Sequence, residues 1–160
     1  MNEQIRIKLF DQARQSLQEN NIEKAEKLLF SILDASNLFV GIHKIYGLLG
    51  KIFFDKKDYI KAIDFCEKSL KVNPSFELAS LGKYLSLIEL GKDADAIAEL
   101  DRFVSKFKVN LYIDTLQELL DDIRIGYAAN FEQTIIRLAK ANGLETSSTG
   151  STAGTPPAED

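Results

Sequence analysis

Apolar residues recur with a helical period along most of the chain, most clearly between residues 46 and 74. Tyr46, Leu49 and Phe53 are spaced i, i+3 and i+7, which places them on one face of a helix. After a polar stretch at 55–58, a second run has the same period, with apolar positions Ala62, Ile63, Cys66 and Leu70. Pro74 should end that run, because proline lacks a backbone N–H and constrains the residue before it. The pattern predicts two helices joined by a short turn.

Small residues stand where these two helices should cross. Gly50 lets a neighbouring backbone approach closely, although glycine lowers helix propensity, and Ala62 provides a similar gap on the second helix. A single hairpin of this kind cannot bury both of its apolar faces. The sequence should therefore contain further copies.

Two further copies can be aligned on the small residue of the second helix. Ala96 lies 34 residues after Ala62, and Ala25 lies 37 residues before it. The first connection would then be three residues longer than the second, within the stretch 34–41. We expect helical hairpins at about 2–36, 42–74 and 76–108.

The third copy departs from the second at the position of closest contact. Tyr84 stands where Gly50 stood, and Lys83 stands where Leu49 stood. A bulky side chain there would push the two helices apart. We expect either a looser pair or a local shift of register, which Gly82 would permit.

The C-terminal third no longer follows the repeat. Apolar residues with a helical period predict a helix over 111–125 and a last helix over 131–141, with Asn130 and Gln133 resembling a capping box. These two helices would form a cap over 111–142 that covers the last hairpin. Residues 144–160 are rich in Ser, Thr, Gly, Ala and Pro and lack aromatic residues, which predicts a disordered tail. The folded domain is expected to span 1–143.

The motif Tyr46-x2-Leu49-Gly50-x2-Phe53, followed by Ala62-x3-Cys66 and by Pro74, resembles the tetratricopeptide repeat. The 34-residue spacing of the second and third copies is also the period of that family. The resemblance implies an all-α fold, a solenoid of three helical hairpins with a C-terminal capping helix pair. It also implies a protein that binds a segment of a partner protein on its concave side and is not an enzyme.

Composition and charge exclude several other classes of function. The net charge is −4 and acidic and basic residues are interleaved, so we expect no nucleic-acid partner. The single cysteine cannot form an intramolecular disulfide, which fits a reducing compartment. No stretch has the length and hydrophobicity of a membrane span, and residues 1–10 lack the apolar region of a secretory signal. We expect a cytoplasmic protein that does not insert into membranes.

The sequence offers no set of residues for catalysis, for a cofactor or for a metal ion. His43 is the only histidine and Cys66 the only cysteine, and they are interpreted as a helix-start residue and a small buried group. Gly50-Lys51 resembles the end of a phosphate-binding loop, but Ile52 stands where Ser or Thr is required. We expect no enzyme activity.

The concave side of a tetratricopeptide solenoid is lined by fixed positions of each first helix, and here these are mostly large apolar residues with three basic ones. The implied partner-binding residues are Ile7, Phe10, Arg14, Leu17, Lys44, Gly47, Lys51, Phe54, Leu78, Leu81, Leu85 and Ile88. An apolar groove with basic side chains suits an amphipathic or extended segment that carries acidic residues. Gly47 would leave a hole in which an anchoring side chain could enter.

Two alternatives to an open groove remain at this point. A register shift in the third hairpin would make Leu81, Leu85 and Ile88 core residues, or the last helix or the tail would fill the groove. The groove hypothesis describes a protein or peptide receptor that acts as an adaptor, scaffold or chaperone. A different class is a self-associating structural subunit, a homo-oligomer formed through the C-terminal helices around 111–123. The size and three-repeat plan are also similar to tetratricopeptide-repeat chaperones of type III secretion.

Overall fold

A computed structural model describes residues 1–35 and 41–146. Within these residues the chain forms eight α-helices and one 3-10 helix and no strand, which confirms the all-α prediction. Most of the predicted disordered tail, 147–160, lies outside the described residues. The chain divides into two compact units, Met1–Tyr112 and Ile113–Asp160, and each is described by itself.

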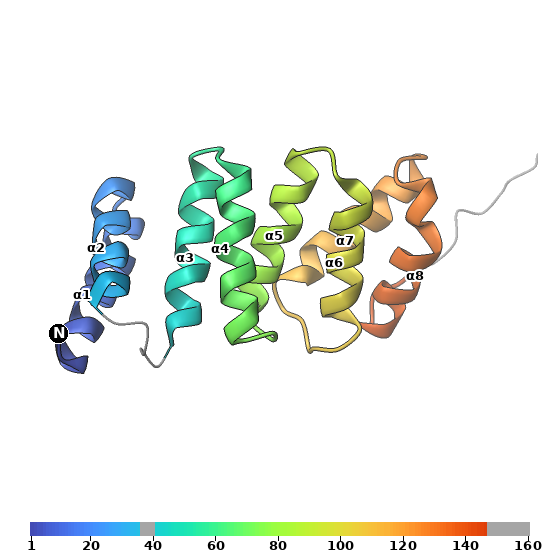
Figure 1. Ribbon diagram of the computed structural model, residues 1–160. Helices are drawn as coiled ribbons and strands as arrows, with labels where there is room; N and C mark the ends of the chain where they lie inside the picture. Colours follow the sequence, from blue (N-terminus) through green and yellow to red (C-terminus); the bar gives the residue numbers. More distant parts are fainter. Residues whose placement is uncertain (36–40, 147–160) are drawn as a thin grey trace, which may run out of the picture. The chain divides into compact units, whose positions relative to one another are not determined.

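The first unit consists of six helices that pair as three successive hairpins (Figure 1). The helices are α1 (Glu3–Gln18), α2 (Ile22–Ala35), α3 (Ile42–Asp55), α4 (Tyr59–Val72), α5 (Glu77–Glu89) and α6 (Asp93–Val104). Each helix packs on the next one in the chain, and α3 also packs on α5, so that α4 lies against both of these first helices. This stacking covers the apolar faces that a single hairpin leaves exposed.

The three hairpins turn in the same way. A residue with positive φ follows the first helix of each pair: Asn20 (58°), Lys57 (62°) and Gly91 (68°). The backbone N–H of the next residue then donates to a carbonyl five residues earlier, as in Asp58 to Phe53 and Lys92 to Leu87. These turn residues keep the 37- and 34-residue spacings of the repeat.

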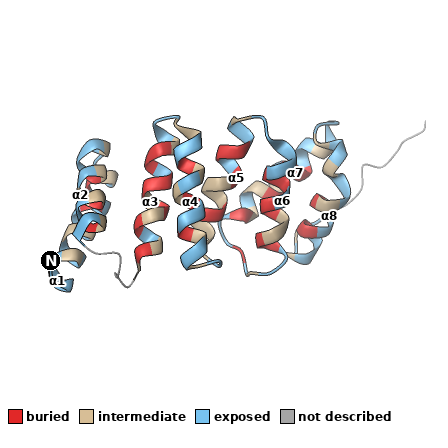
Figure 2. Ribbon diagram, in the orientation of Figure 1, coloured by how far each residue is buried: buried red, intermediate tan, exposed pale blue. Residues whose placement is uncertain are grey.

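The core of the first two hairpins is apolar and is buried on the facing sides of the helices (Figure 2). Cys66 of α4 lies at the closest crossing. A Cβ atom added to Gly50 of α3 would lie 2.6 Å from the Cys66 sulfur, and one added to Gly82 of α5 would lie 3.0 Å from it. Both neighbouring helices therefore approach α4 through a glycine.

The third hairpin keeps the register of the second. The register shift that Tyr84 made a possibility therefore does not occur. Buried residues Ala79, Tyr84, Ser86 and Leu87 lie 34 residues after Ile45, Gly50, Ile52 and Phe53, which are also buried. Ala79 and Ser86 of the third hairpin stand where the second hairpin has Ile45 and Ile52. Its ring contacts the edge of Tyr112, with 6.0 Å between ring centroids.

The second unit contains the rest of α7 (Tyr112–Arg124), the 3-10 helix η1 (Ala129–Phe131) and α8 (Glu132–Ala141). The predicted capping box at Asn130 is wrong: Phe131 is the N-cap of α8, and no side chain caps that end. Leu116 and Leu120 of α7 are buried. Ile125 and Tyr127 are instead 71% and 69% exposed.

None of the helices in the described part of the chain is both long enough and apolar enough to span a bilayer.

Candidate functional site: a groove between the first helices

A cavity of about 290 Å³ lies between the first helices of the three hairpins. We call it the first-helix groove, and its lining residues are Phe10, Arg14, Lys44, Leu48, Phe76 and Leu78. Two residues come from α1, two from α3 and two from the start of α5. Four of the six, Phe10, Arg14, Lys44 and Leu78, are among the partner-binding residues that the repeat resemblance implies.

The loop before α5 positions Phe76 in this groove. Asn73 ends α4, and its side-chain oxygen accepts hydrogen bonds from the backbone N–H (3.1 Å) and the hydroxyl (2.8 Å) of Ser75. The Phe76 backbone N–H then donates to the Asn73 carbonyl, and Phe76 becomes the N-cap of α5. A short polar turn therefore places an aromatic ring at the N-terminus of the next helix.

Gly47 does not leave a hole for a partner side chain, which corrects the prediction from sequence. Gly47 is buried, and a Cβ atom added to it would lie 2.6 Å from the ring of Phe76. The ring of His43 meets Phe76 edge-on, with 4.9 Å between centroids. The protein's own aromatic side chain thus fills the space above Gly47.

Two of the three predicted basic residues remain available in the groove. Arg14 and Lys44 are exposed, and neither forms an ion pair within the described part of the chain. Lys51 instead lies outside the cavity lining and pairs with Asp55, one helical turn further along α3, at 2.6 Å. The positive charge of the groove therefore comes from Arg14 and Lys44.

Burial shifts the pKa of each titratable side chain singled out in the sequence in the direction that favours its neutral form. Burial, and then the charge of Lys44, lowers the pKa of His43. Burial raises the pKa of the Cys66 thiol to about 12, which agrees with its interpretation as a small buried group. Among the described residues, no three His, Cys, Asp or Glu side chains are grouped so that they could hold a metal ion.

The other predicted groove residues do not line the cavity. Leu17 and Phe54 are partly buried and pack against the core of the first two hairpins, whereas Ile7 is exposed. Leu85 and Ile88 are each 37% exposed, so neither is the core residue that a shifted register would have made it.

Sequence reasoning missed Leu48 and Phe76. Leu48 is adjacent to the motif residue Leu49 and was not among the inner positions of the repeat. Phe76 lies between the proline that ends α4 and the first turn of α5, outside the helical period. Phe76 is the N-cap of α5 and makes no side-chain cap hydrogen bond, so the usual polar signal of a helix start is missing there.

Residues 43–76, which span α3, α4 and the loop to Phe76, match the family model of the tetratricopeptide repeat. The prediction of this repeat is confirmed for that stretch. Repeats of this family generally mediate protein–protein binding and are generally not catalytic. No curated protein matches the chain, and no solved structure does.

Proposed function

We propose that this chain is a non-enzymatic interaction module that binds a peptide or helix of a partner protein in the first-helix groove. The observation that carries the proposal is the cavity itself. Its walls, from three first helices, are apolar, and it contains two cations that form no ion pair within the described residues. As an adaptor, scaffold or chaperone, the protein would act in the cytoplasm.

The lining indicates which partner segment fits best. The rings of Phe10 and Phe76 and the side chain of Leu78 favour an apolar anchor. Arg14 and Lys44 favour an acidic residue beside it, through exposed and therefore salt-sensitive contacts. The volume of about 290 Å³ suits one or two side chains rather than a whole helix.

Charge reversal in the groove tests this proposal. The Arg14→Glu/Lys44→Glu double variant should lose partners that the wild-type protein captures from native cells, and the measured affinity for such a partner should fall by about tenfold or more at low salt. Both side chains are exposed, so the melting temperature should change little.

Lys51→Glu is the matched control, since it also reverses a charge on α3 but lies outside the cavity lining. Partners should remain bound to this variant. Equal capture by wild type, control and double variant would contradict a role for the groove.

A second candidate function, self-association, is favoured by the exposure of Ile125 and Tyr127 between α7 and α8. In this case Ile125→Ser/Tyr127→Ser should lower the mass measured by light scattering, and the groove variant should not. A wild-type mass equal to that of one chain would argue against it.

A further inference from the structure

The first-helix groove opens where the first hairpin meets the second. We call this contact the first junction, and the contact between the second and third hairpins the second junction. At the second junction α5 packs on α3 and along α4. At the first junction α2 packs on α3 less extensively, and in the residues that the structure describes α1 and α3 are not packed on each other as α3 and α5 are. The cavity of about 290 Å³ lies at this looser junction.

Two glycines bring the helices together at the second junction. Gly82 of α5 faces α4, where an added Cβ atom would lie 3.0 Å from the Cys66 sulfur. Gly47 of α3 faces the start of α5, where an added Cβ atom would lie 2.6 Å from the ring of Phe76. A large side chain at either position would push the third hairpin away from the second.

Large apolar residues stand at the equivalent positions of the first junction. Leu48 lies 34 residues before Gly82, and Phe10 lies 37 residues before Gly47, which are the spacings of the repeat. Both side chains are half-buried, pack against the core of the first two hairpins and line the groove. The distance between packed helices depends on the side chains at their contact. This pair should therefore keep α1 further from α3 than α3 is from α5.

The helix face that contains Leu48 shows the same difference along its length. Positions spaced i, i+3 and i+7 share one face of a helix, and in the two helices these are Ile45, Leu48 and Ile52 of α3 and Ala79, Gly82 and Ser86 of α5. The flanking isoleucines, the alanine and the serine are all buried. The first junction is therefore built from larger side chains than the second.

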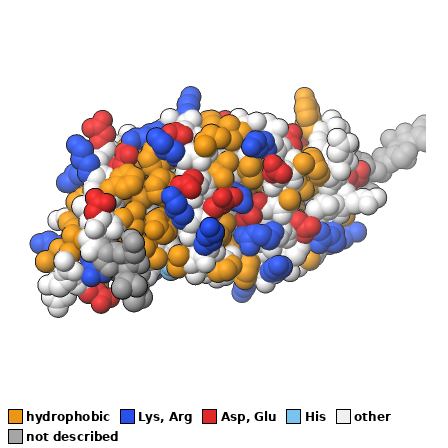
Figure 3. Space-filling view, viewed as in Figure 1, with side chains coloured by type: hydrophobic (Ala, Val, Ile, Leu, Met, Phe, Trp, Pro, Cys, Tyr) orange, Lys and Arg blue, Asp and Glu red, His pale blue; other side chains and the backbone are white. Residues whose placement is uncertain are grey.

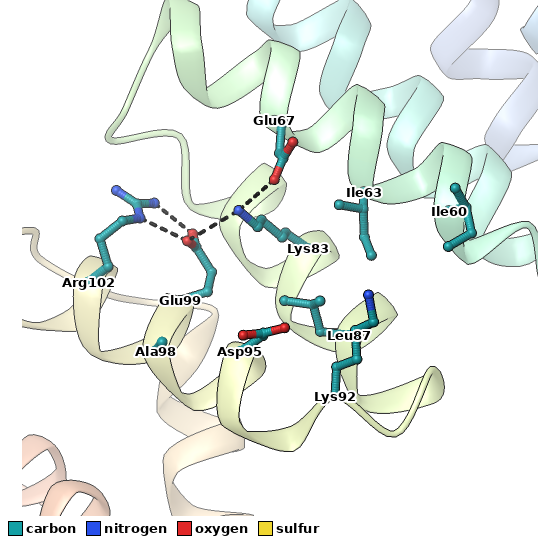
Figure 4. A pocket seen from close by; sticks show the side chains of 10 residues that line it. All are labelled: Ile60, Ile63, Glu67, Lys83, Leu87, Lys92, Asp95, Ala98, Glu99 and Arg102. Carbon is teal, nitrogen blue, oxygen red and sulfur yellow. Dashed lines mark hydrogen bonds and ion pairs between the residues drawn. The ribbon is translucent and has the colours of Figure 1, made fainter.

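Ion pairs add to the close packing of the second junction. Lys83 of α5 pairs with Glu67 of α4 at 2.8 Å and lies 4.0 Å from Glu99 of α6, beside a cavity of about 490 Å³ (Figure 4). One repeat earlier the residues at these three places are apolar: Leu49, Phe30 and Phe65. In the view of Figure 3, hydrophobic side chains gather between α2 and α3, whereas charged side chains cover the region of α4 and α6.

We propose that Phe10 and Leu48 are spacers, which hold the first-helix groove open and set the size of the partner side chain that can enter it. Between α3 and α5 the glycines let the helices close on each other, whereas between α1 and α3 the two large side chains prevent this. Both residues thus determine the specificity of the groove. This role rests on the proposed function as far as a partner occupies the groove, but the spacing of the helices depends on no ligand.

Pairs of spin labels at equivalent positions of the first helices measure this spacing. Gln18, Asp55 and Glu89 are exposed and occupy the same repeat position on α1, α3 and α5. Each pair is introduced as cysteines, and Cys66 should stay unlabelled because it is buried and its thiol has a pKa of about 12. Electron paramagnetic resonance should give a distance between labels 18 and 55 that exceeds the distance between labels 55 and 89 by about 2 Å or more.

Phe10→Ala/Leu48→Ala should shorten the distance between α1 and α3 by about 1–2 Å and leave the distance between α3 and α5 unchanged. Each single substitution should shorten it less, and the single variants carry the test if circular dichroism shows that the double variant does not fold. Ile7→Ala is the matched control, since it removes an exposed apolar side chain of α1 that does not line the groove. It should change neither distance.

The proposal is overturned if the two distances are equal in the otherwise wild-type protein. It is also overturned if the alanine variants keep or lengthen the distance between α1 and α3, because the groove would then stay open without these side chains. The measurement involves no partner, so its failure is distinguishable from a failure of the charge-reversed groove variant to lose partners.

Discussion

The sulfur of Cys66 occupies the point where α4 meets both α3 and α5. Added Cβ atoms at Gly50 and Gly82 would lie 2.6 Å and 3.0 Å from it, so the thiol fills the space that two glycines leave. A methyl group at Gly50 would also lie 3.4 Å from the Ala62 carbonyl oxygen, an ordinary van der Waals distance, so the close approach is to the Cys66 sulfur. The helices are therefore held at their separation by the smallest residues available.

We predict that Gly50→Ala destabilises the fold by about 1–2 kcal/mol, although alanine is the better helix former. Overpacking costs about 1–3 kcal/mol, and the gain in helix propensity offsets at most about 1 kcal/mol of it. Cys66→Ala should also destabilise, by leaving a small cavity. The loss of stability in the combined variant should be smaller than the sum of the two single losses, because the new methyl group then enters the space that the thiol vacated. Urea unfolding of all four proteins would measure this coupling, and simple additivity would show that the two side chains do not compete for space.

At the scale of a single element, α6 is fixed to α5 and to the start of α7 by a buried carboxylate. Glu99 is only 5% exposed and accepts hydrogen bonds from Ser80 and Arg102, and the Ser80 hydroxyl also lies 2.9 Å from the Tyr112 hydroxyl. Glu77 adds a second link, since its carboxylate accepts from the backbone N–H of Tyr112 at 2.9 Å. Both links lie within the first unit.

Glu99→Ala should destabilise the protein by about 2 kcal/mol, because it leaves the buried Ser80 hydroxyl and the partly exposed Arg102 guanidinium without their acceptor. Glu99→Gln should cost less, since its amide oxygen still accepts from Ser80. Thermal unfolding of the two variants beside wild type gives this order. The reverse order, or an unchanged melting temperature for Glu99→Ala, would mean that water replaces the carboxylate without cost.

The elements of the first unit could be predicted from sequence because their signals are local. Helical period, the glycine at the crossing and the proline after α4 identify the hairpins, and the 34-residue spacing of Ala62 and Ala96 aligns two of them. The effect of Tyr84 could not be predicted, because its ring meets Tyr112, a residue of the helix that follows the third hairpin. The packing of Phe76 on Gly47 could not be predicted either, since this contact joins a loop to a helix of another hairpin. The Lys51–Asp55 pair, by contrast, could have been anticipated from its i, i+4 spacing.

For the whole molecule, the division into Met1–Tyr112 and Ile113–Asp160 has a consequence for stability. In stacked helical repeats each hairpin is stabilised mainly by its neighbours, so local opening need not spread along the chain. Ile135 of α8 is fully buried and belongs to the second unit, and Cys66 and Glu99 belong to the first. Damage to one unit should therefore remain largely confined to it.

Ile135→Ala should cost about 2–5 kcal/mol in local stability, as expected for truncating a buried isoleucine. Hydrogen exchange followed by mass spectrometry should show faster exchange in α8 and in the part of α7 after Tyr112, while the peptides of α3 and α4 exchange as in wild type. Leu29→Ala, at an equally buried position of α2, is the matched control and should leave exchange in α8 unchanged. If either substitution accelerated exchange in both units alike, the two units would unfold as one cooperative body. That result would contradict the prediction that the second unit can unfold locally while the first stays folded.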